Sequence, residues 1–290
     1  MLSLYSYLEI INNKDKWNIL EGGISNKIYK FNNYVVKVIE KKNDNLFLVL
    51  SNYYKILEKF DTTLYIDYND NIIIEKYIEG EIISNEELFK NDFCLKIFDL
   101  IDNFIYKLNY DIIKENIIKK YINNLTDYLE ENQIFLNEYI QIKEIVYPLI
   151  YKHFNNDDIL LYFSHNDIHK YNIIISKDKL NFIDYEYSGY TWKYFDHCNF
   201  IVLLMNEIIT QNNNISKENI NEYFNLNFYL NILVQKYSNY SKEYFLEMMI
   251  ISSYTWYLWS FVKYHLNKDT MYIDYSKQMK FIIEYLVLLL

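Results

Sequence analysis

Polar side chains stand at the ends of two short apolar runs in the second half of the chain. His165, Asp167 and Asn172 form a His-x-Asp-x4-Asn pattern, and Asp184 follows Asn172 by twelve residues. Transfer of a γ-phosphoryl group needs a carboxylate that orients a hydroxyl and hard oxygen ligands that hold Mg²⁺. The spacing therefore predicts a phosphoryl-transfer site with Asp167 as the base and with Asn172 and Asp184 on the metal.

The segment between these polar residues predicts a β-hairpin. Ile173 to Ile175 and Leu180 to Ile183 are apolar, largely β-branched runs on either side of a short polar turn. Such a hairpin would bring Asn172 and Asp184 together at its open end. A polar loop before an ordinary hairpin is the alternative, but the His before the pattern and the Asp after it favour the phosphoryl-transfer site.

The composition indicates a globular protein of unusual residue usage. The 290 residues are 51% hydrophobic and 19% aromatic, and they include no alanine and no arginine. A net charge of −10 provides no basic stripe for a nucleic-acid backbone, so we expect no nucleic acid as a partner, which leaves a small-molecule substrate open. Two cysteines are too few for a disulfide framework, and the N-terminus does not resemble a signal peptide. We therefore expect a cytoplasmic protein.

The uncharged stretch Met248 to Val262 is the strongest candidate for a membrane segment. It is shorter than the roughly 20 residues that a spanning helix needs, and charged residues bound it on both sides. We expect a buried helix and no membrane span.

A glycine-containing turn near the N-terminus has two extended neighbours. Gly22 and Gly23 precede the runs Ile28 to Phe31 and Tyr34 to Ile39, which Asn32-Asn33 would join as a hairpin. Such a turn can lay backbone N–H groups over phosphates, although an ordinary hairpin turn is an equal alternative. The chain has only four glycines, so two in succession favour the phosphate-binding interpretation.

Lys37 lies in the strand that follows this turn. The alternation of Val36, Lys37 and Val38 puts the lysine on the opposite face from the valines, where it could reach the α and β phosphates of a nucleotide. A solvent-facing lysine is the alternative. The helix predicted over residues 45–60 offers a glutamate only at its end, so the usual glutamate partner of such a lysine is not at its expected place.

A second hairpin, Leu64 to Tyr68 with Ile72 to Ile74, leads into an extended crossing. Backbone groups from Glu75 to Tyr77 could meet an adenine edge there, and a plain strand end is the alternative. The pattern from Ser84 to about Phe154 is helical, whereas residues 210–240 are polar and rich in asparagine.

Two tryptophans and one aspartate complete the set of candidate residues. Trp256 and Trp259 are three positions apart and share one helix face, where two indoles could seat a quaternary ammonium. Core packing is the alternative explanation for an aromatic pair. Asp196 is expected to hold the catalytic loop by hydrogen bonds and is also a candidate to cap the helix that follows.

These motifs, taken together, resemble a choline/ethanolamine kinase of the aminoglycoside-phosphotransferase superfamily. They occur in the family's order along nearly the whole chain: GGISNKIYKF (Gly22 to Phe31), SHNDIHKYNIII (Ser164 to Ile175), FIDYEYSGY (Phe182 to Tyr190), FDHCN (Phe195 to Asn199) and WYLW (Trp256 to Trp259).

The resemblance implies an α+β, two-lobed protein-kinase-like fold with a small antiparallel-sheet N-lobe and a larger, mainly helical C-lobe. Residues 1–79 would bind ATP, and residues 80–290 would contain the catalytic loop and the substrate pocket. The implied reaction is the ATP-dependent phosphorylation of choline's hydroxyl with Mg²⁺, and ethanolamine or another amino alcohol remains open.

The resemblance also implies roles for single residues. Asp167 matches the base, and Asn172 and Asp184 match the magnesium ligands. The cofactor-binding set is Gly23, Ser25, Asn26, Lys37, Glu75 and Tyr77. The aromatic walls of the choline pocket are Tyr187, Trp256 and Trp259.

Two other readings stay open. An antibiotic phosphotransferase of the same fold would need an acidic cleft for a polycationic sugar, which the tryptophan pair disfavours. A catalytically silent kinase-like module would fit the displaced glutamate, but it does not fit the intact Asp167, Asn172 and Asp184.

Overall fold

The computed structural model describes most of the chain in two compact units. The described residues are 2–20, 27–38, 63–67, 70–104, 115–134, 137–154, 161–177, 179–212 and 214–290. The first unit is Met1–Leu88 with Lys170–Ser188, and the second is Phe89–His169 with Gly189–Leu290. The fold is α+β, with a small antiparallel sheet in the first unit and a mainly helical second unit. The predicted boundary at residue 79 stays a prediction.

The first unit is built around a five-stranded antiparallel sheet of order β1-β2-β3-β5-β4 and a three-stranded sheet of order β6-β8-β9. Its elements are α1 (Leu4–Asn12), η1 (Lys14–Lys16), β1 (Asn18–Ile19), β2 (Lys27–Phe31), β3 (Tyr34–Val38), β4 (Thr63–Asp67), β5 (Ile72–Lys76), β6 (Glu81–Ile82), α3 (Asn85–Leu88), η3 (Lys170–Asn172), β8 (Ile173–Ser176), β9 (Lys179–Phe182) and η4 (Tyr185–Tyr187).

The hairpins predicted from the sequence are confirmed. β2 pairs with β3, β4 with β5, and β8 with β9, each in antiparallel register. Asn32 adopts a positive φ of 51° in the turn between β2 and β3, a conformation that asparagine tolerates better than most residues. Local alternation and turn chemistry are therefore sufficient to specify these strand pairs.

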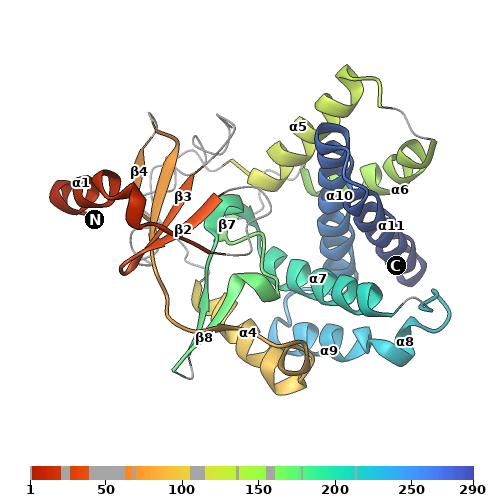
Figure 1. The fold of residues 1–290 in the computed structure, drawn as a ribbon. Coiled ribbons are helices and arrows are strands. Elements are labelled where there is room, and N and C mark those ends of the chain that lie inside the picture. The colour runs from red at the N-terminus through yellow and green to blue at the C-terminus, as the bar shows by residue number, and fades with distance from the viewer. Residues whose placement is uncertain are drawn as a thin grey trace. The chain divides into compact units, whose positions relative to one another are not determined.

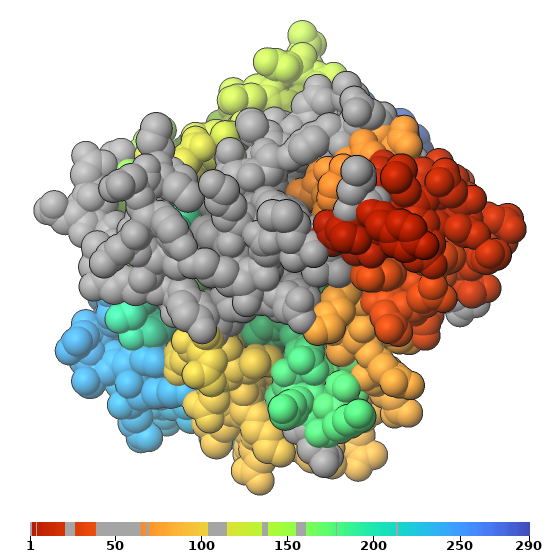
Figure 2. All heavy atoms as spheres, turned by 90° about the vertical axis from the view of Figure 1, so that its left-hand side faces the viewer, coloured from red at the N-terminus to blue at the C-terminus, as the bar shows by residue number. Residues whose placement is uncertain are grey.

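Helix α1 covers one face of the five-stranded sheet. Ile10 of α1 packs with Val36 of β3 and Ile74 of β5 in a core from which water is excluded. In Figure 2 the N-terminal residues (red) lie beside the strands (orange) that they cover. Val36 faces this core, so the pleat directs its neighbour Lys37 to the other face of the sheet.

The second unit consists mainly of helices. Its elements are α4 (Asn91–Phe104), α5 (Ile117–Glu131), α6 (Asn137–Phe154), β7 (Leu161–Ser164), β10 (Gly189–Trp192), α7 (Phe195–Gln211), α8 (Ile220–Tyr223), α9 (Leu226–Lys236), α10 (Lys242–Asn267) and α11 (Met271–Leu289). β7 and β10 form a two-stranded antiparallel sheet, in which Ser164 lies opposite Gly189.

Helix α10 is the centre of the second unit. It contacts α5, α6, α7, α9 and α11, and it lies side by side with α11 in Figure 1. It is buried on all sides, as its apolar sequence from Met248 to Val262 predicts. Two of its small polar residues satisfy their hydroxyl groups within the helix: Ser253 donates to the Met249 carbonyl and Thr255 to the Ile251 carbonyl.

The expectation for residues 210–240 was incomplete. The stretch contains helix α9, which the asparagine-rich composition conceals. Asn225 caps its N-terminus by accepting a hydrogen bond from the Phe228 N–H. Within the described part of the chain, no helix is both long and apolar enough to cross a membrane.

Gly80 makes a close backbone contact that provides a test of the first unit. A Cβ atom at this position would lie 2.3 Å from the Ile175 carbonyl oxygen and 2.6 Å from Cγ2 of Ile174. We predict that Gly80→Ala lowers the free energy of unfolding by about 2 kcal/mol, because β6 and β8 would have to move apart. Urea denaturation measures this loss.

The matched control is Glu79→Ala, which changes the exposed neighbouring residue. It should alter stability by no more than about 0.5 kcal/mol. Equal stability of the two variants would contradict the close packing of Gly80 on β8.

Candidate active site

Lys37 is the centre of a buried charge cluster in the first unit. Its side chain projects from β3 and is 7% exposed. The ammonium Nζ lies 2.7 Å from Oδ1 of Asp184 and 2.9 Å from Oε2 of Glu75. Burial by itself would lower the pKa of Lys37, but the charges of Asp184 and then Glu75 override it and raise the pKa. The lysine is therefore held charged between two carboxylates.

Glu75 takes part in this cluster through its side chain. It lies on β5, two residues beyond Ile73, which is the cross-strand partner of Lys37, so both side chains share one face. The sequence predicts only a backbone contact with adenine for Glu75, and it offers the lysine no glutamate at the expected place in residues 45–60. Those residues lie outside the described part of the chain, and within the described part the glutamate that pairs with Lys37 is Glu75.

The β8–β9 hairpin brings Asn172 and Asp184 to the same end, as predicted. Ile173 pairs with Phe182, and the Ile183 N–H donates to the Asn172 carbonyl at 3.0 Å. Asn172 is buried, and Asp184 adopts a left-handed backbone conformation with φ of 64°. This rarely populated conformation persists because the hairpin and the pairing of Asp184 with Lys37 fix it.

The loop containing Asp167 belongs to the second unit and is held there by hydrogen bonds. It follows β7, and its first two peptide N–H groups, those of His165 and Asn166, donate to the Asp196 carboxylate at 2.7 Å each. The Asp167 N–H donates to Nδ1 of His165 at 3.3 Å, so His165 braces the loop from within. Asn166 has a positive φ of 65°, which asparagine accepts more readily than most residues.

Asp196 performs the first of its two expected roles and not the second. Its fully buried carboxylate holds the loop, whereas the N-cap residue of α7 is Tyr194 and Asp196 lies in the first turn. Burial raises the pKa of Asp196 to about 7, and the two N–H groups of His165 and Asn166 partly oppose this rise. A cap was a reasonable expectation from its position, but its oxygens are directed at the loop.

The two tryptophans of α10 have different surroundings. Their ring centroids are 5.7 Å apart at an interplanar angle of 82°. Trp256 is buried, and its indole N–H donates to Oδ1 of Asn199 at 2.8 Å. Trp259 is more exposed and packs edge-to-face on Tyr272 and Tyr275 of α11, at 5.5 Å and 5.9 Å.

Tyr275 is a candidate site residue that the sequence reasoning missed. Its pKa is raised first by burial and then by the negative charge of Asp167, which places the phenol within electrostatic reach of the predicted base. Tyr272 and Tyr275 are three residues apart in the last helix, the spacing that marked the tryptophans. That spacing could have found the pair, but it gave no indication that α11 packs on α10.

Of the remaining predicted site residues, the structure describes Tyr77 and Tyr187. Gly23, Ser25 and Asn26 lie outside the described residues. The backbone N–H of Tyr77, a predicted adenine contact, donates to the Asn33 carbonyl at 2.8 Å. Tyr187 ends the short helix η4.

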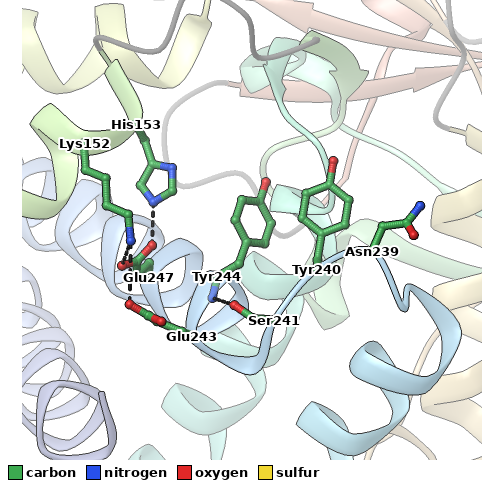
Figure 3. Close-up of a pocket in the computed structure, with 8 residues that line it drawn as sticks. All are labelled: Lys152, His153, Asn239, Tyr240, Ser241, Glu243, Tyr244 and Glu247. Carbon is green, nitrogen blue, oxygen red and sulfur yellow. Dashed lines mark hydrogen bonds and ion pairs between the residues drawn. The ribbon is translucent and has the colours of Figure 1, made fainter.

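A separate pocket of about 360 Å³ lies at the N-terminus of α10 (Figure 3). Glu247 is the most buried residue that lines it, and its carboxylate accepts from Nζ of Lys152 at 2.6 Å and pairs with Nε2 of His153 at 2.7 Å. Burial lowers the pKa of His153, which Glu247 counteracts. Because these side chains are one another's partners, they join α6 to α10, and we assign them a structural role.

Several solved structures share this fold. The ethanolamine kinase of Plasmodium vivax is 17% identical, with a TM-score of 0.67 over 96% of this chain and 86% of that one. The choline kinase LicA from Streptococcus pneumoniae is 19% identical, with a TM-score of 0.66 over 98% and 99%, and it has also been solved with AMP. APH(2″)-IIa in complex with gentamicin is 17% identical, with a TM-score of 0.62 over 98% and 99%. At these identities the likeness shows a kinase-like fold.

The sequence itself shows the family. Residues 17–285 match the sequence model of the family described as choline/ethanolamine kinase. The match spans most of the 290 residues, so this chain belongs to the choline/ethanolamine kinase family. Family membership supports a kinase-like phosphotransferase.

One curated protein also matches. The DNA-directed RNA polymerase subunit β″ of Plasmodium falciparum (isolate 3D7) is 29% identical over 192 residues, which are 57% of this chain and 20% of that protein. The chain therefore spans about a fifth of the length of the curated relative that it matches. A chain with such a biased composition, without alanine or arginine, shares many identical positions with another biased chain by composition alone. We therefore infer no function from this match.

Removal of the central lysine tests the charge cluster. We predict that Lys37→Met lowers the free energy of unfolding by about 3–5 kcal/mol, because Glu75 and Asp184 would be left without their counter-ion. Lys179→Met removes an exposed lysine from β9 and should change stability by about 0.5 kcal/mol or less. Urea denaturation of both variants makes the comparison, and equal losses would show that the cluster contributes nothing specific.

The pKa of Asp196 predicts a pH dependence of stability. Since its pKa is raised to about 7, the folded chain keeps a proton that the unfolded chain releases near pH 4, and stability from this group falls as the pH rises toward 7. The free energy of unfolding, measured for the wild type minus Asp196→Asn, should fall between about pH 5.5 and pH 7 by at most about 1.4 kcal/mol per unit. A difference that does not change with pH would contradict the raised pKa.

Proposed function

We propose that this chain transfers the γ-phosphoryl group of ATP to the hydroxyl of choline or a related small amino alcohol. The observation that carries the proposal is the charged Lys37 held against Asp184, in a chain of the choline/ethanolamine kinase family whose Asp167 loop is fixed by a buried carboxylate. A fixed ammonium and a fixed carboxylate are the parts that phosphoryl transfer requires, because the reaction depends on positioning and charge neutralisation.

Lys37 would bind the phosphates of the nucleotide. When ATP enters, its phosphate oxygens can replace Asp184 as a partner of the ammonium, while Glu75 keeps the lysine oriented. Glu75 thereby provides the carboxylate that the sequence did not locate. The nucleotide itself is supported by the AMP complex of LicA, which has this fold.

Asn172 and Asp184 would hold Mg²⁺. An amide oxygen and a carboxylate at one end of the β8–β9 hairpin are the hard donors that this ion prefers. Among the described residues no cluster of three or more His, Cys, Asp and Glu could hold a metal. Two protein ligands suit Mg²⁺, which takes its other ligands from phosphates and water. The ion would neutralise the charge of the phosphates.

Asp167 would act as the base. Its carboxylate accepts the proton of the acceptor hydroxyl as that oxygen bonds to the γ-phosphorus, and the bond from phosphorus to the β,γ-bridging oxygen breaks to release ADP. The loop that presents Asp167 is anchored through backbone N–H groups on Asp196, so the carboxylate is positioned before substrate binds.

Aromatic rings would hold the cationic end of the acceptor. Trp259 is packed against Tyr275, whose phenol is near Asp167, and the Lys263 ammonium lies 5.6 Å from the centroid of the Trp259 ring. The ring face therefore already accepts a cation. Tyr187 is proposed as a further wall of this pocket.

Aminoglycosides are the competing acceptors, because APH(2″)-IIa with gentamicin has the same fold. A polycationic sugar is held by several carboxylates, whereas the described surroundings of Trp259 are aromatic. Turnover measured with an amino alcohol and with an aminoglycoside therefore decides between these two classes of acceptor.

Turnover by the purified protein tests the proposal. We predict ADP release with ATP and Mg²⁺ in the presence of choline or ethanolamine and not with gentamicin. Asp167→Asn removes the base and should lower kcat by a factor of about 10²–10⁴. ADP release is followed in a coupled assay.

Two results would overturn this assignment. Absence of turnover with all three acceptors would exclude the proposed reaction, and turnover by Asp167→Asn at the wild-type rate would exclude Asp167 as the base.

A further inference from the structure

Asn199 is the junction of a buried hydrogen-bond network in the second unit. Its side chain is fully buried, and Nδ2 donates to the Asn166 carbonyl at 3.1 Å. Its Oδ1 accepts from Oγ of Ser252 at 2.7 Å and from Nε1 of Trp256 at 2.8 Å. An indole nitrogen can only donate, so this orientation of the amide is the one that satisfies all three contacts.

The network acts on the residue before the predicted base. Asn166 has a left-handed backbone conformation, with φ of 65°, and hydrogen bonds hold it from both sides. Asp196 accepts its N–H, and Asn199 donates to its carbonyl, which belongs to the peptide that leads into Asp167. A backbone conformation of this kind persists only where its surroundings fix it. The direction of the Asp167 side chain therefore depends on Asn199.

Trp256 is connected to this peptide through a single side chain. Its ring is 6% exposed, and its N–H is used by Asn199. Trp259, one turn further along α10, is more exposed, and its Nε1 has no hydrogen-bond partner among the described residues. The two indole N–H groups therefore differ, because that of Trp256 is hydrogen-bonded and that of Trp259 is not among the described residues. The sequence pattern alone does not distinguish the two residues.

We propose that Trp256 is a positioning residue that acts through Asn199 on the Asn166–Asp167 peptide, while Trp259 contacts the acceptor. This inference deepens the proposed function and rests on it for its kinetic consequence. It divides a tryptophan pair that would otherwise form one aromatic wall into a residue for catalytic rate and a residue for acceptor affinity.

Phenylalanine substitutions separate the two roles. Trp256→Phe keeps an aromatic ring and removes the N–H that Asn199 accepts. We expect kcat to fall on the order of tenfold, because the base is displaced, with less than about a threefold change in KM for the acceptor or ATP. Trp259→Phe shrinks the ring that faces the acceptor, and its main effect should be an increase in KM for the acceptor of about tenfold.

Ser252→Ala is a second variant that leaves every aromatic ring in place. It removes the other donor to Oδ1 of Asn199, so kcat should fall by several-fold, again without a change in the acceptor KM. Thermal unfolding of the three variants identifies any loss of kcat that comes from an unfolded fraction.

Hydrogen exchange gives a readout that does not need turnover. Amide exchange in a peptide spanning residues 161–172 should be faster in Trp256→Phe and Ser252→Ala than in the wild type, and unchanged in Trp259→Phe. Wild-type protein that phosphorylates none of the acceptors would overturn the proposed function, while the exchange data would still test the positioning role.

The proposal would be overturned if Trp256→Phe raised KM for the acceptor at an unchanged kcat. Unchanged exchange around Asp167 in both Trp256→Phe and Ser252→Ala would also overturn it.

Discussion

The contact between Asp196 and the loop that contains Asp167 is the constraint on which the proposed chemistry depends. A fully buried carboxylate accepts two backbone N–H groups, those of His165 and Asn166, at 2.7 Å. Desolvation of such a group is costly, and these hydrogen bonds offset part of that cost. The result is a loop whose backbone is fixed before any substrate binds. Asn199 completes the arrangement by donating to the Asn166 carbonyl, so Asn166 is held at both its N–H and its carbonyl.

The first unit holds a buried positive charge, that of Lys37, between two carboxylates. Lys37 lies between Glu75 and Asp184; burial raises the pKa of Glu75, and the charge of Lys37 opposes this rise. With both carboxylates ionised, the cluster has an excess of negative charge. Such a cluster favours the approach of a cation to Asp184, because the added positive charge would relieve part of the imbalance. In the proposed function this cluster would receive a metal ion at Asp184, whereas buried ion pairs by themselves are weak evidence for stability.

The sequence predicted those features that depend on local pattern. The three hairpins follow from alternation and turn residues. The burial of α10 follows from its long stretch without charged residues. Contacts that depend on register or helix packing were not predictable. Glu75 reaches Lys37 because β5 pairs with β3 in one particular register, and Tyr275 reaches Trp259 because α11 packs along α10. Helix α9 was concealed by asparagines whose individual roles, such as the cap at Asn225, are visible only in the folded chain.

The fate of the γ-phosphate tests the central claim most directly. ³¹P NMR of the purified protein with ATP, Mg²⁺ and choline follows every phosphorus atom in one sample. We predict that the γ-phosphate signal of ATP is replaced by a phosphate monoester signal in an amount equal to the ADP formed, and that omission of choline prevents the change. Formation of inorganic phosphate without an ester, at the same rate with and without choline, would contradict the account.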